Sequence, residues 1–152
     1  IVDWQYRIPS GGHRPVTQVF AREKTKTSLK KALQEGQTVV WFKKKLIGKK
    51  DFLIPLINST LKVQSAKYFA NTTVAHVTIS NNSDAPYTLR NHSKYDFYNL
   101  TDLVMIPANG QVNIDVRTIE KLRKFTLKFE VLNALTAPKT HPVIDIIIKV
   151  KQ

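Results

Sequence analysis

Four stretches in the second half of the chain alternate between apolar and mostly polar residues. They lie at 75–80, 112–116, 125–131 and 144–150. Successive side chains of a β-strand point to opposite faces, so a period of two gives a strand one apolar face and one polar face. Strands of this kind pair antiparallel and cover a shared core with their apolar faces. The alternation therefore predicts antiparallel β-sheet for this half of the chain.

Turn-forming residues separate these strands. They occur at 81–86 (NNSDAP), 107–110 (PANG) and 137–138 (AP), and such residues interrupt strands. Short strands at this spacing are typical of an immunoglobulin-like (Ig-like) sandwich. We therefore predict an antiparallel Ig-like β-sandwich over residues 61–152. Because the chain has no cysteine, the term describes the architecture alone.

Residues 1–60 follow a different pattern, typical of an α/β segment. Two strands and an intervening helix are predicted, with the strands at 16–21 and 38–42. Thr25 or Thr27 can cap the N-terminus of this helix, and Gly36 lies where a glycine commonly ends one. The apolar face of the helix is made by Leu29, Ala32 and Leu33.

A second helix is predicted to begin after a cap at Asp51. Pro55 lies inside it and is expected to bend or shorten it. The chain as a whole is thus predicted to be α+β, with a short α/β segment over 1–60 followed by the sandwich over 61–152. The pattern changes abruptly between them, so we expect the two parts to pack directly.

The composition excludes several classes of protein. Without cysteine there is no disulfide, thiolate metal ligand or cysteine nucleophile. No apolar run approaches the 18 or so residues that indicate a membrane-spanning helix. The net charge is +13, but outside a cluster at 43–50 the basic residues are scattered. No nucleic-acid-binding motif accompanies them, so the charge favours solvated lysine faces over a nucleic-acid partner.

Motifs that would indicate catalysis are missing from the sequence. The histidines, His13, His76, His92 and His141, fall in no metal-binding spacing. There is no Gly-x-Ser-x-Gly nucleophile motif and no glycine-rich phosphate loop. Carboxylates are few and dispersed, so no acid–base pair can be assigned. We therefore nominate no catalytic residue and no metal ligand in this chain.

One run has the composition of a ligand-binding loop, and it consists of Gly11, Gly12, His13, Arg14 and Pro15. The two glycines permit a tight turn or the close approach of a ligand. His13 can titrate near neutral pH, and Arg14 can hold a phosphate through two hydrogen bonds. The alternative is a structural turn in which Arg14 pairs with a carboxylate. The residues alone leave both open.

A second candidate surface is aromatic. Tyr95, Phe97 and Tyr98 lie close together between two predicted strands. Exposed, they would form a stacking platform, and the sandwich would be a binding module for carbohydrate or protein at the cell envelope. Half-buried, they would close one end of the sandwich.

The run 11–41 (GGHRPVTQVFAREKTKTSLKKALQEGQTVVW), continued by 46–61 (LIGKKDFLIPLINSTL), resembles a known family. It is similar to the C-terminal end of PHP-type (polymerase and histidinol phosphatase) metal-dependent phosphoesterases. The resemblance is to bacterial members in which a distorted (β/α) barrel precedes a β-sandwich tail. It covers about the first 60 residues and weakens beyond them. One departure is Gln37, where relatives usually have arginine.

The resemblance implies that residues 1–60 are a remnant of the barrel and that the chain is the non-catalytic C-terminal region of a phosphoesterase. The family binds divalent metals such as zinc, manganese or iron through histidines and carboxylates. Its late Ser-Asp-x-His motif precedes the segment that resembles Asp3–Arg14, so this chain begins after it. We expect the parent enzyme to hydrolyse phosphate esters in the periplasm or after export, and this chain alone to be inactive.

Two partners follow from this interpretation. The first is the rest of the parent's barrel. The second is another copy of the chain, because Val19, Val39 and Trp41 would lack the barrel strands that normally cover them, and exposed apolar strand edges recruit partners.

Overall fold

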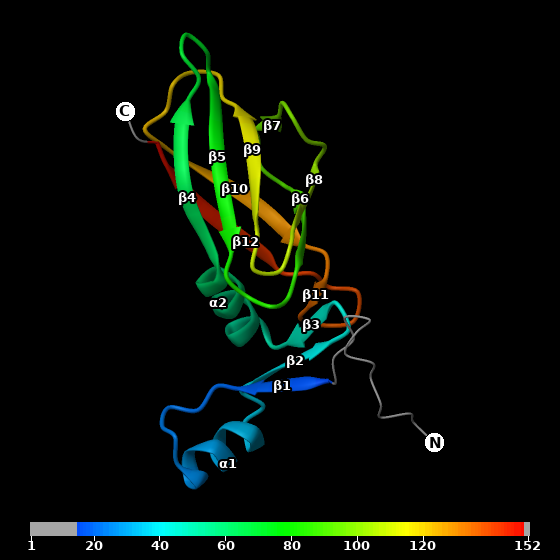
Figure 1. Ribbon diagram of the computed structural model, residues 1–152. Helices are drawn as coiled ribbons and strands as arrows, with labels where there is room; N and C mark the ends of the chain where they lie inside the picture. Colours follow the sequence, from blue (N-terminus) through cyan, green and yellow to red (C-terminus); the bar gives the residue numbers. More distant parts are fainter. Residues whose placement is uncertain (1–14, 151–152) are drawn as a thin grey trace.

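The computed structural model describes residues 15–150 and consists of a β-sandwich with a smaller sheet at one end (Figure 1). Helix α2 (Lys50–Thr60) lies between the small sheet and the sandwich. Helix α1 (Lys26–Gln34) lies beyond the small sheet, at the end of the molecule farthest from the sandwich. Neither helix is long and apolar enough to cross a membrane.

The sandwich is built from two four-stranded sheets. The first has the order β4 (Leu61–Tyr68), β5 (Val74–Asn81), β9 (Gln111–Arg117) and β7 (Asp96–Phe97). The second has the order β12 (Val143–Lys149), β10 (Lys124–Val131), β6 (Tyr87–Asn91) and β8 (Leu103–Ile106). Every pair of neighbouring strands in both sheets is antiparallel. The predicted antiparallel sandwich is therefore confirmed.

The alternation of apolar and polar residues accounts for the core of the sandwich. On β10 the side chains of Phe125, Leu127 and Phe129 are buried, whereas those of Thr126 and Lys128 are exposed. The pairing register places the inward-facing residues of β10 beside those of β12, so that both strands present their apolar sides to the same interior. The four predicted alternating stretches correspond to β5, β9, β10 and β12.

The small sheet has the order β1 (Val16–Val19), β2 (Thr38–Phe42), β3 (Lys45–Gly48) and β11 (Ala134–Leu135). Strands β2 and β3 form a hairpin whose turn includes Lys43 in a left-handed conformation, with a φ of 55°. The lysine cluster at 43–50 is thus in part a hairpin turn and strand β3, which the charge pattern did not predict. Strand β11 enters from the sandwich half of the chain and pairs parallel with β3.

The interpretation of residues 1–60 as a barrel remnant is not confirmed. In a (β/α) barrel, strands joined by a helix run parallel, whereas β1 and β2 are antiparallel. Strand β3 then continues antiparallel from β2. The three strands of the described part of the segment form an antiparallel sheet, and the short strand β11 from the other half of the chain is added to it in parallel.

The predicted capping residue is confirmed for helix α1 but not for helix α2. Thr25 caps α1, because its hydroxyl accepts the backbone N–H of Ser28 at 3.2 Å. Gly36 follows the helix with a φ of +66°, as predicted. Helix α2 begins at Lys50 without a side-chain cap, so Asp51 lies in its first turn, where a carboxylate complements the helix dipole. Pro55 does not end this helix.

One hydrophobic core runs through both parts of the molecule. Helix α2 buries Leu53 and Ile57 completely, and both belong to the same cluster as the sandwich core. Val39 of β2 and Leu46 of β3 join this cluster from the small sheet. The expectation that the two parts pack directly is confirmed, with α2 packed between the small sheet and the sandwich.

Candidate functional site

The predicted phosphate-binding loop, Gly11, Gly12, His13 and Arg14, lies outside the described residues. The first described residues, from Pro15, lead into edge strand β1, whose side chains are mostly exposed. The role of the loop stays a prediction.

The aromatic side chains between β6 and β8 do not share one exposed face. Tyr95 is only 8% exposed and packs edge-on against Phe125, with ring centroids 5.3 Å apart. Phe97 is half-buried and lies 6.0 Å from the ring of Phe129. Tyr98 is 68% exposed, with the Arg117 guanidinium 5.5 Å from its ring centroid. Positions 95 and 97 are two apart and so point inward together. Tyr95 and Phe97 therefore agree with the half-buried alternative, in which the aromatic side chains close part of the sandwich.

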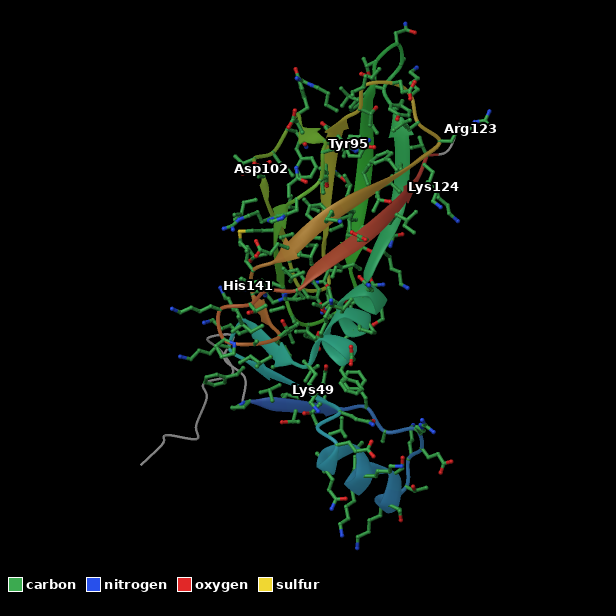
Figure 2. The ribbon with its side chains drawn as sticks, turned by 180° about the vertical axis from the view of Figure 1, so that it is seen from behind. Lys49, Tyr95, Asp102, Arg123, Lys124 and His141 are labelled. Carbon is green, nitrogen blue, oxygen red and sulfur yellow. The ribbon has the colours of Figure 1, made fainter. Side chains whose placement is uncertain are left out.

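The described histidines lie apart from one another, each with its own partner. His76 Nδ1 lies 2.6 Å from Asp115 Oδ1 on the outer face of β5 and β9. His92 Nε2 lies 3.3 Å from a Glu130 carboxylate oxygen. His141 Nδ1 lies 2.8 Å from the backbone oxygen of Ala134, near the small sheet (Figure 2). Across residues 15–150, no three metal-ligating side chains come together.

The His76–Asp115 pair is a contact that sequence reasoning missed. The two residues are 39 positions apart, and the alternation indicated only that both lie on polar faces. The Phe69 ring lies 5.5 Å from the His76 ring, and the backbone N–H of Asp115 is bound by the side chain of Asn99 at 2.8 Å. The pair links the neighbouring strands β5 and β9, on which His76 and Asp115 lie directly opposite one another.

A single asparagine holds the small sheet against the sandwich. The Asn133 side chain donates to the backbone oxygens of Lys44 (2.9 Å) and Pro86 (2.7 Å). It also accepts the backbone N–H of Thr88 at 3.0 Å, and its own backbone oxygen accepts the N–H of Leu46 at 2.9 Å. Both parts of the molecule are thus bonded to one residue. In the sequence Asn133 looks like an ordinary turn residue, since its partners are distant.

The junction also contains a hollow of about 230 Å3, lined in part by Trp41, Leu46, Leu56 and Tyr87. The hydroxyl groups of Thr60 and Tyr87 are hydrogen-bonded at 2.8 Å beside it. Small-molecule sites usually enclose about 300–1,000 Å3. The hollow falls below that range, and we describe it as a packing feature of the junction.

Helix α1 carries an apolar face that is open in the described structure. Leu29 and Leu33 are 45% and 51% exposed, and only Ala32 of this helix is buried. Val39, which we expected to be exposed, is fully buried, and Trp41 is half-buried against the core. The reason is that β2 is an inner strand of its sheet and contacts α2. The exposed apolar side chains of the segment are therefore those of Leu29 and Leu33 on α1, together with Val16 on β1 and Ile47 on β3.

Comparisons with known proteins bear on the fold of the whole chain. Residues 61–147 match a family described as an Ig-like domain, DUF5001. The chain is also similar to a two-domain protein from Bacteroides vulgatus that contains a predicted PHP-like metal-dependent phosphoesterase. The TM-score is 0.79 at 22% identity, over 94% of this chain and 41% of that one. No curated protein matches this sequence. The expected likeness to PHP-type proteins with a β-sandwich is confirmed at the level of the fold.

Proposed function

We propose that this chain, which belongs to the DUF5001 family of Ig-like domains, is the non-catalytic C-terminal part of a metal-dependent phosphoesterase. The observation that carries the proposal is the fold match over 94% of this chain to a protein with a predicted PHP-like phosphoesterase domain. The match takes up 41% of that protein. Under this proposal the remaining part of the parent supplies the chemistry.

Under this proposal the two parts of the parent have different roles, catalysis in the upstream domain and structural support in this chain. Phosphoesterases of the metal-dependent kind activate water and neutralise the phosphate with divalent ions held by several converging side chains. The parent's ions, of the zinc, manganese or iron type, would be bound by residues outside this chain. The sandwich would contribute a rigid, well-packed body attached to the catalytic domain.

We further propose that the chain divides near residue 60, with residues 1–60 as the junction to the catalytic domain. Helix α1 supports this, since Leu29 and Leu33 form an apolar face at the end of the molecule away from the sandwich. A hollow beside the helix is lined by Val19, Ala21 and Leu29 among others. The catalytic domain would cover this surface, and burial of apolar area stabilises such a contact by about 25 cal/mol per Å2.

The loop that contains His13 and Arg14 would then lie on the catalytic side of the junction, since it immediately precedes β1. Its arginine would contact the substrate phosphate, and the histidine would lie nearby. Gly11 and Gly12 would allow the backbone to approach the ligand.

The gene provides the first test. We expect the coding sequence upstream of Ile1 to encode His-x-His and Asp-x-His motifs, which place metal ligands at strand ends. An upstream region that encodes an unrelated domain, or none, would contradict the proposal.

A second test addresses the junction. The upstream domain and this chain are expressed as separate polypeptides and their association is measured by calorimetry. We expect binding that Leu29→Glu with Leu33→Glu weakens at least tenfold, because each substitution places a charge in an apolar contact. Leu103→Glu is the matched control, since Leu103 is 43% exposed but lies on the sandwich. Equal losses from both variants would rule out α1 as the contact.

A further inference from the structure

The charge of the sandwich is concentrated at one end. We call this end the distal tip; it is the end opposite the small sheet, where β4, β9 and β12 finish and β5 and β10 begin (Figure 1). Its seven exposed basic residues are Lys67, Lys94, Arg117, Lys121, Arg123, Lys124 and Lys149. Only two carboxylates, Asp96 and Glu120, accompany them. The rest of residues 61–150 has four basic residues and five carboxylates. The distal tip is thus at +5 and the remainder of the sandwich at −1, counted with neutral histidines.

The clustering follows from the strand pairing. Lys124 pairs directly with Lys149, and Arg117 lies opposite Asp96 at the end of β9. Figure 2 places Arg123 and Lys124 together where the chain enters β10. Like charges directly opposite one another on neighbouring strands are destabilising. The sandwich carries this cost at the distal tip, and a negatively charged partner would relieve it.

An exposed apolar side chain lies in the loop that follows Arg117 and contains Lys121. Ile119 is 97% exposed, in the loop between β9 and β10. Phe69, in the loop between β4 and β5, is 44% exposed. A fully exposed isoleucine keeps its whole apolar surface in contact with water. An apolar partner that covers Ile119 would remove this surface from water, which is favourable.

The loop that carries Ile119 is held at both ends by the hydroxyl of Tyr68. This hydroxyl accepts the backbone N–H of Leu122 at 2.7 Å and lies 3.2 Å from the hydroxyl of Thr118. Thr118 is further bonded to the backbone oxygen of Thr73 through its N–H and its hydroxyl, at 3.0 and 2.7 Å. The anchors lie on either side of residues 119–121, so they fix the base of the loop and leave its apex in solvent. Ile119 is therefore presented by a constrained loop.

A cavity of about 460 Å3 opens beside the loop. Its charged lining consists of Lys94, Arg117, Asp96 and Glu120, and its apolar lining includes Tyr95, Ile119 and Leu122. The volume lies within the range of sites for small molecules. Cationic and apolar groups thus meet at one opening.

We propose that the distal tip binds the surface of a membrane that contains anionic phospholipids. Ile119 and Phe69 enter the interface between headgroups and acyl chains, and the surrounding lysines and arginines contact lipid phosphates. Basic residues near an anionic bilayer and apolar residues at its boundary reinforce one another in this way. The proposal is independent of whether the parent is a phosphoesterase.

The combination of side chains favours a bilayer over other polyanions. Nucleic acids are bound by lysines and arginines with aromatic rings on which bases stack, and a fully exposed isoleucine gains nothing from such a contact. Glycans are held by aromatic platforms and hydrogen-bonding groups, and the aromatic side chain in this cavity, Tyr95, is buried. A bilayer uses both the charge and the isoleucine.

The experiment measures co-sedimentation of the whole chain with phosphatidylcholine vesicles, with and without phosphatidylglycerol. We expect binding only to the anionic vesicles, weakened by salt. Lys121→Glu with Arg123→Glu should weaken binding at least tenfold, since each basic residue near the bilayer contributes about fivefold. The matched control is Lys26→Glu with Lys30→Glu on helix α1, at the opposite end of the molecule, which should have little effect.

A second measurement reports directly on insertion. Because the chain has no cysteine, Ile119→Cys accepts an environment-sensitive dye at a single position. We expect a blue shift of its emission with anionic vesicles and none for Met105→Cys, whose residue is 69% exposed on the outer face of β8. Circular dichroism checks that each variant is folded.

Three results would overturn the proposal. The first is the absence of binding to anionic vesicles. The second is binding that the α1 variant weakens as much as the variant at the distal tip, because adsorption would then follow total charge. The third is an unchanged dye spectrum at position 119. Tight, salt-dependent binding of DNA that Lys121→Glu with Arg123→Glu abolishes, without vesicle binding, would assign the basic surface to nucleic acid instead.

Discussion

The sandwich and the N-terminal segment bury their apolar residues to very different extents. Of the buried apolar residues in the described chain, 21 lie in residues 61–150 and five in residues 15–60. Helix α1 contributes only Ala32, which is not part of the main core cluster. The sandwich thus has a complete interior, whereas the segment depends on what it packs against.

The two helices make the same contrast on a smaller scale. Helix α2 places Leu53 and Ile57 in the continuous core and contacts strands of both parts. Helix α1 has a good N-cap and a regular apolar face, yet that face is largely exposed. Local signals are therefore enough to start and stop a helix, but they do not show whether its partner belongs to the same unit.

Truncation is the change with the largest expected effect on this contrast. We expect residues 49–152 to fold cooperatively and residues 1–48 to be unfolded, because the latter contain too little buried apolar surface for a stable core. Residues 61–152 should fold as well, but with a free energy of unfolding about 3–6 kcal/mol lower than that of residues 49–152. This difference is the free energy gained by burying two large aliphatic side chains of α2. Circular dichroism and urea denaturation measure both. A stable, soluble 1–48 fragment would contradict this expectation and show that the N-terminal segment folds on its own.

Truncation of a single side chain should destabilise the protein more in the sandwich than in the N-terminal segment. Phe129→Ala removes a fully buried ring from the sandwich and should lower the free energy of unfolding by about 3–5 kcal/mol. Leu33→Ala, at a side chain that is half exposed on α1, should change it by less than about 0.5 kcal/mol. Chemical denaturation of both variants decides the point, and similar losses would show that α1 is part of the cooperative core.

The bond network of Asn133 is the next test, since it links the two parts. Asn133→Ala leaves the backbone groups of Lys44, Pro86 and Thr88 without their partner, and we expect a loss of about 1–3 kcal/mol. Hydrogen exchange should rise most at β3 and β11. Asn82→Ala, at an exposed loop position, is the control. An effect of Asn133→Ala no larger than that of the control would mean that the junction is held by the apolar core alone.

The smallest expected effect is on self-association. The exposed face of α1 should give weak dimers at high protein concentration, strengthened by salt because the segment is basic. Leu29→Glu with Leu33→Glu should abolish them. If light scattering finds a monomer at every protein concentration and salt level, the chain does not self-associate through α1 and this prediction is wrong.

Periodicity and capping residues predicted α1 and, in the sandwich, β5, β9, β10 and β12, since each of these strands has its own alternating pattern, whereas β4, β6, β7 and β8 were not located individually. They did not predict β3 and β11, because β3 lies within a lysine cluster and β11 has only two residues. The antiparallel pairing of β1 with β2 was missed for another reason. A strand, a helix and a strand are compatible with either direction, and the family resemblance favoured a parallel barrel.

The candidate loop at 11–14 stays a prediction, and the aromatic residues Tyr95 and Phe97 follow the half-buried alternative. Tyr95 and Phe97 turn inward because their partners, Phe125 and Phe129, are supplied by a strand distant in sequence. Ile119 carried no signal of its own, since its exposure depends on the bonds from Tyr68, about fifty positions earlier. Contacts between distant segments decide both cases, and a local pattern does not contain them.

The most direct test of the account is an assay of phosphodiester hydrolysis with the purified chain and with the product of the whole gene. Both are measured with a chromogenic phosphodiester in the presence of manganese or zinc. We expect turnover by the whole product and none by this chain. Metal-dependent turnover by the chain alone, lost on His13→Ala, would contradict it.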